Sequence, residues 1–295
     1  MTTTAQDLKA LQPAKDFFIG IDSDGCAFDT MEPKHKECFC PTTIWKWNLE
    51  AVSKYAREAW DFVNLYGKMR GCNRFIALLA VLDCLRERRE VRARGVEIPE
   101  LPHLRAWVGR ETKLGNPALK AEVDKTGDEE LARVLDWSKA INEAVTRIVR
   151  HVPPFPGVRE SLEKAAPRAD MIVVSQTPFE ALDREWRSHR IDRFVRAIAG
   201  QECGTKSEHI ALAGRGEYPR ERMLMIGDAY GDLTAAKDND ALFYPILPGG
   251  EEASWQRFHE EALDRFFAGT YAGAYEEELS AELEKALPET PPWKH

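Results

Sequence analysis

Phe17-Phe-Ile-Gly-Ile21, followed at once by Asp22-Ser-Asp24-Gly-Cys-Ala-Phe-Asp29-Thr30, is the stretch of sequence that decides the fold. The first five residues form a short apolar run, which is typical of a buried strand. Asp22 and Asp24 come directly after it and point the same way along an extended backbone. In an open α/β sheet, side chains at the carboxyl end of a strand face the crevice that binds ligands. Two carboxylates this close repel each other unless a shared proton or a cation relieves them, and Mg²⁺ is the hard ion that suits carboxylates.

The composition is that of a globular protein with room for two domains. The chain has 295 residues, of which 43% are hydrophobic. No run approaches the roughly 18 apolar residues of a membrane helix. The first residues, Met1-Thr-Thr-Thr-Ala-Gln-Asp7, lack the basic and apolar regions of a signal peptide. We therefore expect a cytoplasmic protein with no membrane partner.

The net charge of −8 argues against nucleic acid as a partner. The charge is unevenly spread, because residues 31–150 carry 22 Lys and Arg against 18 Asp and Glu. A basic lobe facing an acidic one would suit an anionic substrate, and two solvated surfaces that merely differ would look the same. The arginine cluster from Arg86 to Arg94 has interleaved Glu87 and Glu90, a pattern that fits a solvated helix face.

The six cysteines do not suggest a disulfide framework in a chain of this length without an export signal. His35, Cys38 and Cys40 have a spacing that matches no common zinc pattern, and no second Cys-x-x-Cys pair follows. We expect free, buried or partly buried thiols.

Two kinds of pattern divide the chain. From residue 31 to residue 150, apolar residues recur at helical spacing with no strand signal, which predicts an all-helical unit. This block ends at Val152-Pro-Pro-Phe-Pro-Gly157, a proline-rich hinge. Its aromatic residues could belong to the core or face a substrate, and helical spacing favours the core: Trp45, Trp47, Tyr55, Trp60 and Tyr66.

Beyond Gly157, strand and helix patterns alternate, which indicates βα units and a parallel sheet. The expected strands cover residues 171–174, 197–199, 223–226 and 242–247, and helices are expected to begin at Phe179, Lys206 and Leu233. The predicted fold is therefore α/β: residues 1–30 and 151–250 form a parallel-sheet domain, and residues 31–150 form a helical cap inserted after the first strand. Residues 251–295 are expected to add a helical extension that packs on this domain.

Three later strand ends carry polar residues suited to a site. Ser175 and Gln176 follow the second strand, and Thr177-Pro-Phe-Glu180 has the pattern of a capping box with proline at the first helical position. Thr205-Lys-Ser-Glu208 is a second capping box. It places Lys206 in the first turn of a helix, where the helix dipole disfavours a cation unless an anion faces it.

The fourth strand ends with Gly227-Asp228-Ala-Tyr-Gly-Asp232. Asp232 could cap the next helix, whereas Asp228 has no comparable structural role, so the pattern favours a functional one.

Together these residues resemble the haloacid dehalogenase superfamily of hydrolases. Their order matches its motifs: DxDGxxxDT with Asp22 and Asp24, a serine at a strand end (Ser175), a lysine (Lys206), and GDxxxD with Asp228 and Asp232. The resemblance covers residues 1–30 and 151–250, and it implies a Rossmann-like parallel sheet core there. The family's cap position between the first two motifs matches the helical block. Dehalogenases lack the second aspartate, so Asp24 favours phosphoryl transfer.

The resemblance implies a phosphatase that acts on a small phosphorylated substrate. In such an enzyme Asp22 forms an aspartyl-phosphate and Asp24 is the general acid and base. Mg²⁺ is bound by Asp22, the backbone carbonyl of Asp24 and Asp228, with Asp232 holding it through water or orienting Asp228. Lys206 and Ser175, with Gln176 beside them, bind the transferring oxygens.

Three alternatives stay open at this point. A phosphomutase would use the same motifs and return the phosphoryl group. A phosphonate hydrolase would need a cap lysine that forms a Schiff base, and the candidates by position are Lys34, Lys36, Lys46, Lys54 and Lys68. A regulatory protein that binds a phosphorylated ligand could keep the fold without turnover. The sequence does not identify the substrate or the oligomeric state.

Overall fold

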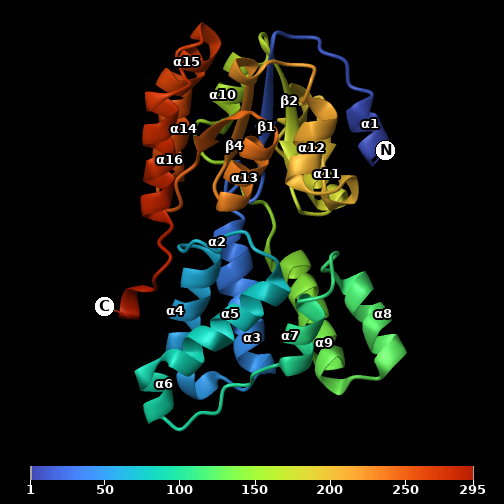
Figure 1. Ribbon diagram of the computed structural model, residues 1–295, viewed down its shortest axis with the longest axis vertical. Coiled ribbons are helices and arrows are strands. Elements are labelled where there is room, and N and C mark those ends of the chain that lie inside the picture. Colours follow the sequence, from blue (N-terminus) through green and yellow to red (C-terminus); the bar gives the residue numbers. More distant parts are fainter. Residues whose placement is uncertain (1, 295) are drawn as a thin grey trace. The chain divides into compact units, whose positions relative to one another are not determined.

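The chain divides into two structural units in a computed structural model that describes residues 2–294. The sheet unit comprises Met1–Thr30 and His151–Leu287, and the helical unit comprises Met31–Arg150 and Pro288–His295 (Figure 1). The helical unit is thus built from two segments, and the chain passes between the units at residues 30/31, 150/151 and 287/288. No helix among the described residues is both long enough and apolar enough to cross a membrane.

The sheet unit contains five parallel strands in the order β3-β2-β1-β4-β5. The strands are β1 (Phe17–Ile21), β2 (Ala169–Val174), β3 (Ala197–Ala199), β4 (Met223–Gly227) and β5 (Leu242–Pro245). This parallel sheet confirms the predicted α/β fold class. Because β1 lies between β2 and β4, the strand order reverses there, as it does at the ligand-binding edge of doubly wound sheets.

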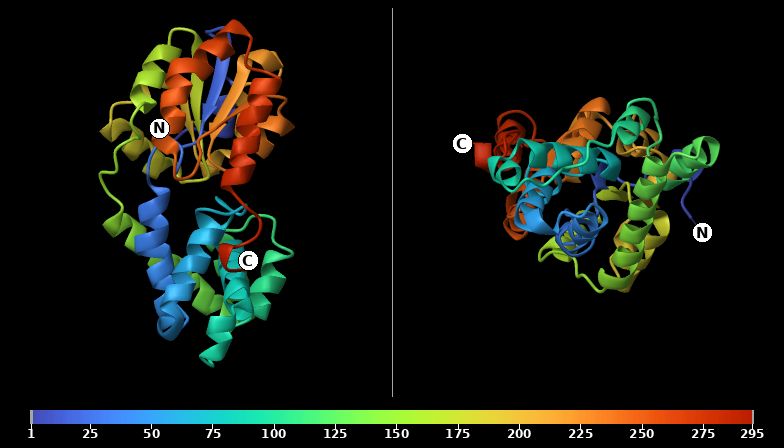
Figure 2. Two further views of the ribbon diagram at one scale, coloured as in Figure 1. Left: turned by 90° about the vertical axis from the view of Figure 1, so that its left-hand side faces the viewer. Right: turned by 90° about the horizontal axis from the view of Figure 1, so that it is seen from below.

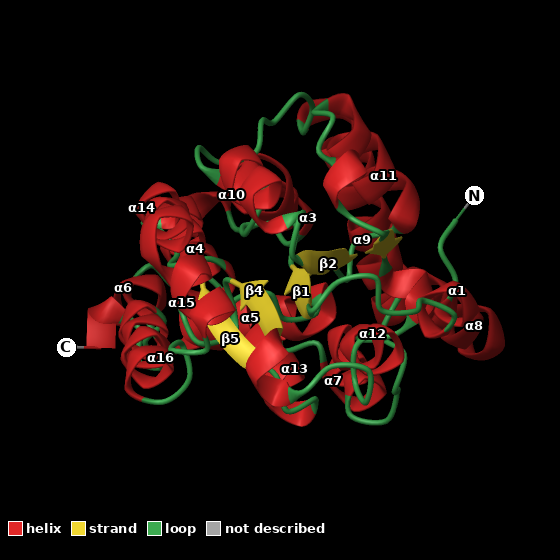
Figure 3. Cartoon of the chain, turned by 90° about the horizontal axis from the view of Figure 1, so that it is seen from above, coloured by secondary structure: helices red, strands yellow, loops and turns green. Residues whose placement is uncertain are grey.

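Helices cover both faces of the sheet, as Figure 3 shows. Alternate residues of each strand enter different cores: Ile19 packs with Trp186 and Trp255 on one face, and Phe18 packs with Ile210 and Leu233 on the other. The helices of this unit are α1 (Ala5–Lys9), α10 (Val158–Ala165), α11 (Phe179–Ser188), α12 (Lys206–Ala213), α13 (Tyr230–Asp238), α14 (Glu251–Arg257), α15 (Leu263–Ala268) and α16 (Ala274–Ala286). Shorter helical turns are η3 (Asp192–Phe194), η4 (Gln201–Cys203), η5 (Arg220–Arg222) and the π-helical η6 (Phe258–Ala262).

Three predicted boundaries were wrong by a few residues. Strand β2 begins at Ala169 rather than 171, because the buried carboxylate of Asp170 is satisfied by the Tyr218 hydroxyl at 2.7 Å and by the backbone N–H groups of Ala14 and Lys15. Strand β5 ends at Pro245, two residues early. Helix α13 begins at Tyr230, three residues early, because Asp232 satisfies backbone donors in its first turn.

The helical unit has its own core, which includes the fully buried Trp60, Trp107 and Trp137. Its helices are α2 (Met31–Pro33), α3 (Cys40–Lys46), α4 (Ser53–Asn64), α5 (Arg74–Glu87), α6 (Arg89–Ala93), α7 (Pro102–Val108), α8 (Asn116–Thr126) and α9 (Glu129–Ile148), with the π-helical η1 (Lys34–Phe39) and the 3-10 turn η2 (Glu50–Val52). Trp47 and Trp60 are buried, whereas Trp45 and Tyr66 are exposed, so helical spacing predicted the core position for only part of the aromatic set.

The last residues of the chain group with the helical unit. Helix α16 belongs to the sheet unit, where it packs beside β5, and the left view of Figure 2 shows the red C-terminal helices next to the strands. After it, the Pro288 carbonyl accepts a hydrogen bond from the backbone N–H of Lys68 at 3.1 Å, and the Trp293 ring packs edge-on against Phe62. The 3-10 turn η7 (Pro292–Lys294) ends this segment. Residues 251–294 are therefore divided between the two units and do not form one extension of the sheet domain.

The cysteines lie within these two units as free thiols. His35 accepts a hydrogen bond from the indole N–H of Trp60 at its Nδ1, 3.0 Å away, and its ring stacks on Phe39. These contacts give His35 a structural place in the helical core.

Candidate active site

The predicted site residues come together at the carboxyl ends of β1, β2 and β4. Asp22 follows β1, and its backbone N–H donates to the Ile226 carbonyl at the end of β4 at 3.0 Å. Asp228 follows β4 directly. Because β1 and β4 pair in parallel with Ile21 opposite Ile226, the two aspartates emerge at the same edge of the sheet.

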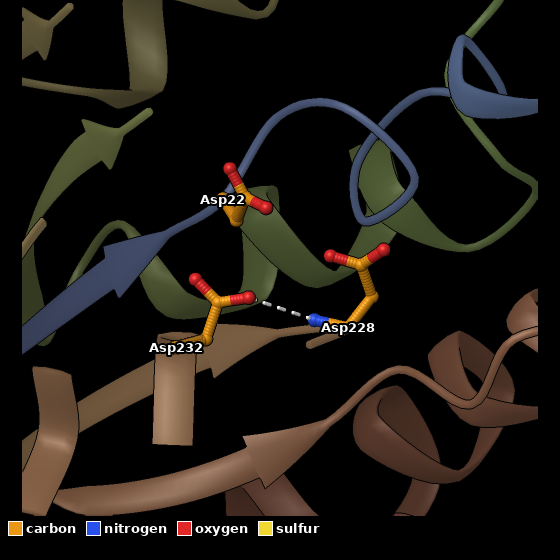
Figure 4. A group of neighbouring side chains, drawn as sticks. All are labelled: Asp22, Asp228 and Asp232. Atoms are coloured by element: carbon orange, nitrogen blue, oxygen red, sulfur yellow. Dashed lines mark hydrogen bonds between the residues drawn. The ribbon is translucent and has the colours of Figure 1, made fainter. Parts of the chain in front are cut away.

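Three carboxylates form a buried cluster at this edge (Figure 4). Asp22, Asp228 and Asp232 each offer an oxygen, and these oxygens lie within 4.8 Å of one another. The three residues are exposed by only 4%, 2% and 0% of their surface. Burial raises the pKa of Asp22 well above its ordinary value, and the neighbouring Asp232 and Asp228 charges add to this against the opposing charge of Lys206. Such a cluster is costly unless positive charge compensates it.

Lys206 supplies one positive charge to the cluster. Its ammonium lies 2.7 Å from Asp232 Oδ1 and 2.9 Å from Asp22 Oδ2. Burial alone would lower the pKa of Lys206, but the charges of Asp22, Asp232 and Asp228 raise it above its ordinary value. The lysine is therefore charged at neutral pH, and the two carboxylates explain a cation in the first turn of α12. The predicted capping box is confirmed, since Thr205 Oγ1 accepts from the Glu208 N–H.

Asp232 has a structural role in addition to its contact with Lys206. Its Oδ2 accepts hydrogen bonds from the backbone N–H groups of Asp228 and Ala229, each at 3.2 Å, which fixes the turn after β4. Gly227 is required there, because a Cβ at this position would lie 2.3 Å from the Cβ of Asp232. The glycine thus lets Asp232 close against the strand end and orient Asp228.

Asp24 is held apart from this cluster by two threonines. Its Oδ1 accepts a short hydrogen bond from the Thr30 hydroxyl, and its Oδ2 accepts one from the Thr177 hydroxyl at 2.6 Å. Both donors favour the ionised carboxylate. A threonine hydroxyl can also turn to accept, so the same pair can hold the protonated form.

The capping box predicted at residues 177–180 was wrong. Pro178, not Thr177, precedes helix α11 as its N-cap, and it makes no side-chain cap. The Thr177 hydroxyl donates to Asp24 and does not cap the helix. The carboxylate of Glu202 instead accepts a hydrogen bond from the Phe179 N–H at 3.1 Å. Sequence reasoning therefore missed Thr177 as a site residue, because the local pattern gave its hydroxyl another partner.

Ser175 and Gln176 differ in their surroundings. Ser175 is buried, and its Oγ accepts from the Thr177 N–H at 3.2 Å. Gln176 is exposed, and its side-chain amide donates to the Gly204 carbonyl at 2.9 Å. Ser175 thus lies in the wall of the strand-end site, whereas Gln176 braces the loop before α12.

Two buried indoles fix the loop that follows β1. The Trp186 N–H on α11 donates to Ser23 Oγ at 3.0 Å, and the Trp255 N–H on α14 donates to the Cys26 carbonyl at 2.7 Å. The Ser23 N–H in turn donates to Asp22 Oδ1 at 2.8 Å. These contacts join residues far apart in the sequence, so no local pattern could have predicted them.

The donor set fits a divalent cation. Three buried carboxylates face a single ammonium, which leaves excess negative charge in a site of oxygen ligands, the kind that Mg²⁺ and similar hard ions prefer. Both oxygens of Asp232 already accept from Lys206 or from backbone N–H groups. Asp22 also has a donor near each oxygen, the Ser23 N–H and the Lys206 ammonium, but only Asp232 is fixed by two backbone N–H groups in the turn after β4.

The chain is similar in structure to hydrolases of the haloacid dehalogenase type. A haloacid dehalogenase-like family hydrolase from Streptococcus pneumoniae is 14% identical, with 83% of this chain and 91% of that chain covered and a TM-score of 0.43. A putative phosphoglycolate phosphatase from Lactobacillus delbrueckii subsp. bulgaricus is 16% identical, with coverages of 83% and 92% and a TM-score of 0.48. A putative beta-phosphoglucomutase from Bacteroides vulgatus is 13% identical, with coverages of 87% and 92% and a TM-score of 0.46.

No family model matches the chain, and no curated protein matches it at a significant level. At these identities the structural similarity concerns the fold alone.

Proposed function

We propose that the protein is a Mg²⁺-dependent phosphatase of the haloacid dehalogenase type, which hydrolyses a small phosphorylated metabolite through an aspartyl-phosphate. The observation that carries this proposal is the buried cluster of Asp22, Asp228 and Asp232 around the ammonium of Lys206. Three carboxylates with a purely structural role are rarely buried together around one cation, because desolvation and mutual repulsion both oppose their burial.

Asp22 is the proposed nucleophile. One of its oxygens forms a bond to phosphorus while the bond from phosphorus to the leaving oxygen breaks, and the aspartyl-phosphate is then hydrolysed by water. The Ser23 N–H on Oδ1 and the Lys206 ammonium near Oδ2 fix the orientation of the carboxylate. The indole contacts to Ser23 and Cys26 keep the loop that carries it in place.

Asp24 is the proposed general acid and base. It gives a proton to the leaving oxygen in the first step and takes one from the attacking water in the second. Its contacts with the Thr30 and Thr177 hydroxyls support this role, since each hydroxyl can donate to the carboxylate or accept from the acid. Lys206 and Ser175, with Gln176 beside them, are the proposed contacts for the phosphoryl oxygens.

Asp22, Asp228 and the backbone carbonyl of Asp24 are the proposed ligands of Mg²⁺, with Asp232 acting through water or by orienting Asp228. When bound, the ion neutralises the charge of the phosphoryl group and of the attacking carboxylate. The contacts of Asp232 with two backbone N–H groups support its indirect role.

The helical unit is the proposed cap, formed by residues 31–150 between two linkers. The chain enters this unit one residue after Thr30, whose hydroxyl contacts Asp24, so the covalent path from the acid to the unit is short. Closure would exclude water before the attack. Limited proteolysis should cut near residues 30–31 and 150–157, and Mg²⁺ with a phosphate analogue should slow these cuts; cutting rates that ignore both ligands would contradict the cap role.

A panel of phosphate esters tests the proposed function. The purified protein, stripped of metal and then supplied with Mg²⁺, should hydrolyse an aryl phosphate and, faster, at least one small phosphorylated metabolite. EDTA should abolish hydrolysis and added Mg²⁺ should restore it. Full activity after exhaustive dialysis against EDTA would reject the proposal, and tight binding of a phosphorylated ligand with no turnover would favour a regulatory binding protein.

A further inference from the structure

A cavity of about 520 Å³ lies within the helical unit, and none of the residues proposed for phosphoryl transfer lines it. It is lined by residues 87–90, 93 and 94, around the start of α6, and by Trp293 and Lys294 of the last segment of the chain. This volume falls within the range of sites that bind small molecules. Most of the lining residues belong to the arginine cluster from Arg86 to Arg94, whose sequence pattern predicted a solvated helix face.

The lining is positively charged in a chain that is negatively charged overall. It holds three arginines and one lysine against two glutamates, whereas the whole chain carries −8. The glutamates have partners: Glu87 lies 2.6 Å from the ammonium of Lys294, and Glu90 lies 3.7 Å from Arg88 Nε. Two positive charges are left over, those of Arg89 and Arg94.

Neither of these two arginines has a carboxylate partner within ion-pair distance among the described residues. Arg94 donates to the backbone carbonyl of Glu90 at 2.9 Å and lies over the Tyr55 ring, and neither contact is an ion pair with a carboxylate. Arg89 is exposed at the start of α6. The wall of the cavity therefore offers two guanidinium groups to an anion.

Arg88 differs from its neighbours, because it is fixed in the wall. It is only 5% exposed, and its guanidinium lies 4.4 Å from the centre of the Trp293 ring and 4.7 Å from that of Tyr55. Its Nη1 donates to Glu58 at 2.6 Å. This stacking joins the last segment of the chain to α6, and it explains why an arginine inside a solvated-face pattern is buried.

We propose that this cavity binds a small polyanion, a metabolite that carries phosphate groups, through Arg89 and Arg94. The proposal goes beyond the proposed phosphatase function and does not depend on it. The size of the cavity limits the ligand to a small molecule, and the net charge of −8 opposes a nucleic acid. Guanidinium groups favour phosphate because their paired N–H donors match its oxygens.

The experiment follows two indole N–H signals by NMR while pyrophosphate is added without divalent metal. Trp293 lines the cavity, and its signal is assigned with Trp293→Phe. Trp186 donates to Ser23 beside Asp22, so its signal reports separately on the phosphatase site. Pyrophosphate should shift the Trp293 signal saturably, and sodium chloride of equal ionic strength should not. A shift of Trp186 alone, or of neither signal, would overturn the proposal.

Matched variants identify the groups that bind. Arg89→Ala combined with Arg94→Ala should weaken pyrophosphate binding at Trp293 by about tenfold or more, since two charges are lost. Arg92→Ala is the control, because Arg92 is exposed on the same helix and does not line the cavity. It should change the affinity less than about twofold. Equal losses in both variants, or no loss in the double variant, would overturn the assignment. Because the double variant keeps Arg88 and its stacking, the fold of the wall stays intact.

Discussion

The two units of the chain bury charge differently: the sheet unit buries three carboxylates together, whereas the helical unit buries single arginines such as Arg88. In the sheet unit, three carboxylates are almost completely buried around one lysine. In the helical unit, charged pairs such as Lys120 and Asp124 are mostly exposed, with 58% and 60% of their side chains accessible. Buried charge persists only where something compensates its desolvation, whereas a solvated pair costs and contributes little. We therefore expect catalysis at the strand ends of the sheet unit, and ligand binding in the helical unit at arginines that lack an ion-pair partner.

The largest expected effect is that of Asp22→Asn. An amide cannot attack phosphorus, so turnover of an aryl phosphate with Mg²⁺ should fall by at least about 10⁴-fold. The unfolding temperature without metal should stay equal or rise, because the substitution removes one of three buried like charges. Steady-state kinetics and calorimetry measure the two effects. Retained turnover would move the nucleophile elsewhere, most simply to an activated water.

The next expected effect concerns His209, which is buried on α12. Burial, with the charge of Lys206 nearby, lowers its pKa from 6.5 to about 4. Between pH 6.5 and pH 4, His209 takes up a proton in the unfolded chain but stays neutral in the folded protein. The folded protein therefore loses stability as the pH falls from 6.5 towards 4. By urea unfolding, the stability of wild type relative to His209→Gln should drop by about 2–3 kcal/mol between pH 7 and pH 4.5. A difference that stays constant with pH would contradict the assignment.

A smaller effect is expected for Thr177→Val, which keeps the shape but removes the donor to Asp24. A hydrogen bond to a charged group is worth about 1.5–3 kcal/mol, so kcat should fall about 10- to 100-fold. The limb of the pH–rate profile that Asp24 controls should also move to higher pH, since the ionised carboxylate loses a donor. Thr177→Ser is the control and should keep most of the activity. An unchanged profile in the valine variant would remove Thr177 from the site.

The smallest effect is expected in the helical unit. Lys120→Ala removes an exposed pair with Asp124 one helical turn away. The free energy of unfolding should change by less than about 0.5 kcal/mol, and kcat should not change. A loss as large as that of a buried group would break the contrast between the two units.

Much of the sheet unit could be predicted from the sequence. Short apolar runs located all five strands, and the polar residues after them located Asp22, Ser175 and Asp228. Lys206 was predicted because a cation in the first turn of a helix is locally unfavourable and so pointed to an anion. Each of these patterns involves only a few neighbouring residues. They suffice to predict a common site because the carboxyl ends of parallel strands lie at one edge of the sheet.

What escaped prediction depends on pairs of residues far apart in the chain. The hydroxyl of Thr177 had a plausible local partner and found Asp24 instead, 153 residues away. The indole of Trp255 meets the Cys26 carbonyl 229 residues away, and Trp293 meets Arg88 across most of the sequence. Periodicity describes one element at a time, so it says which face of a helix is buried and not which distant group it meets.

Trapping the covalent intermediate tests the proposed aspartyl-phosphate at Asp22 most directly. The protein is mixed rapidly with an aryl phosphate and Mg²⁺, quenched in acid and treated with borohydride, which reduces an acyl phosphate to the alcohol. Peptide mass spectrometry should then find homoserine at position 22, only with Mg²⁺ and substrate, and not in Asp22→Asn. A burst of released phenol with unmodified Asp22, or modification at another residue, would contradict the account.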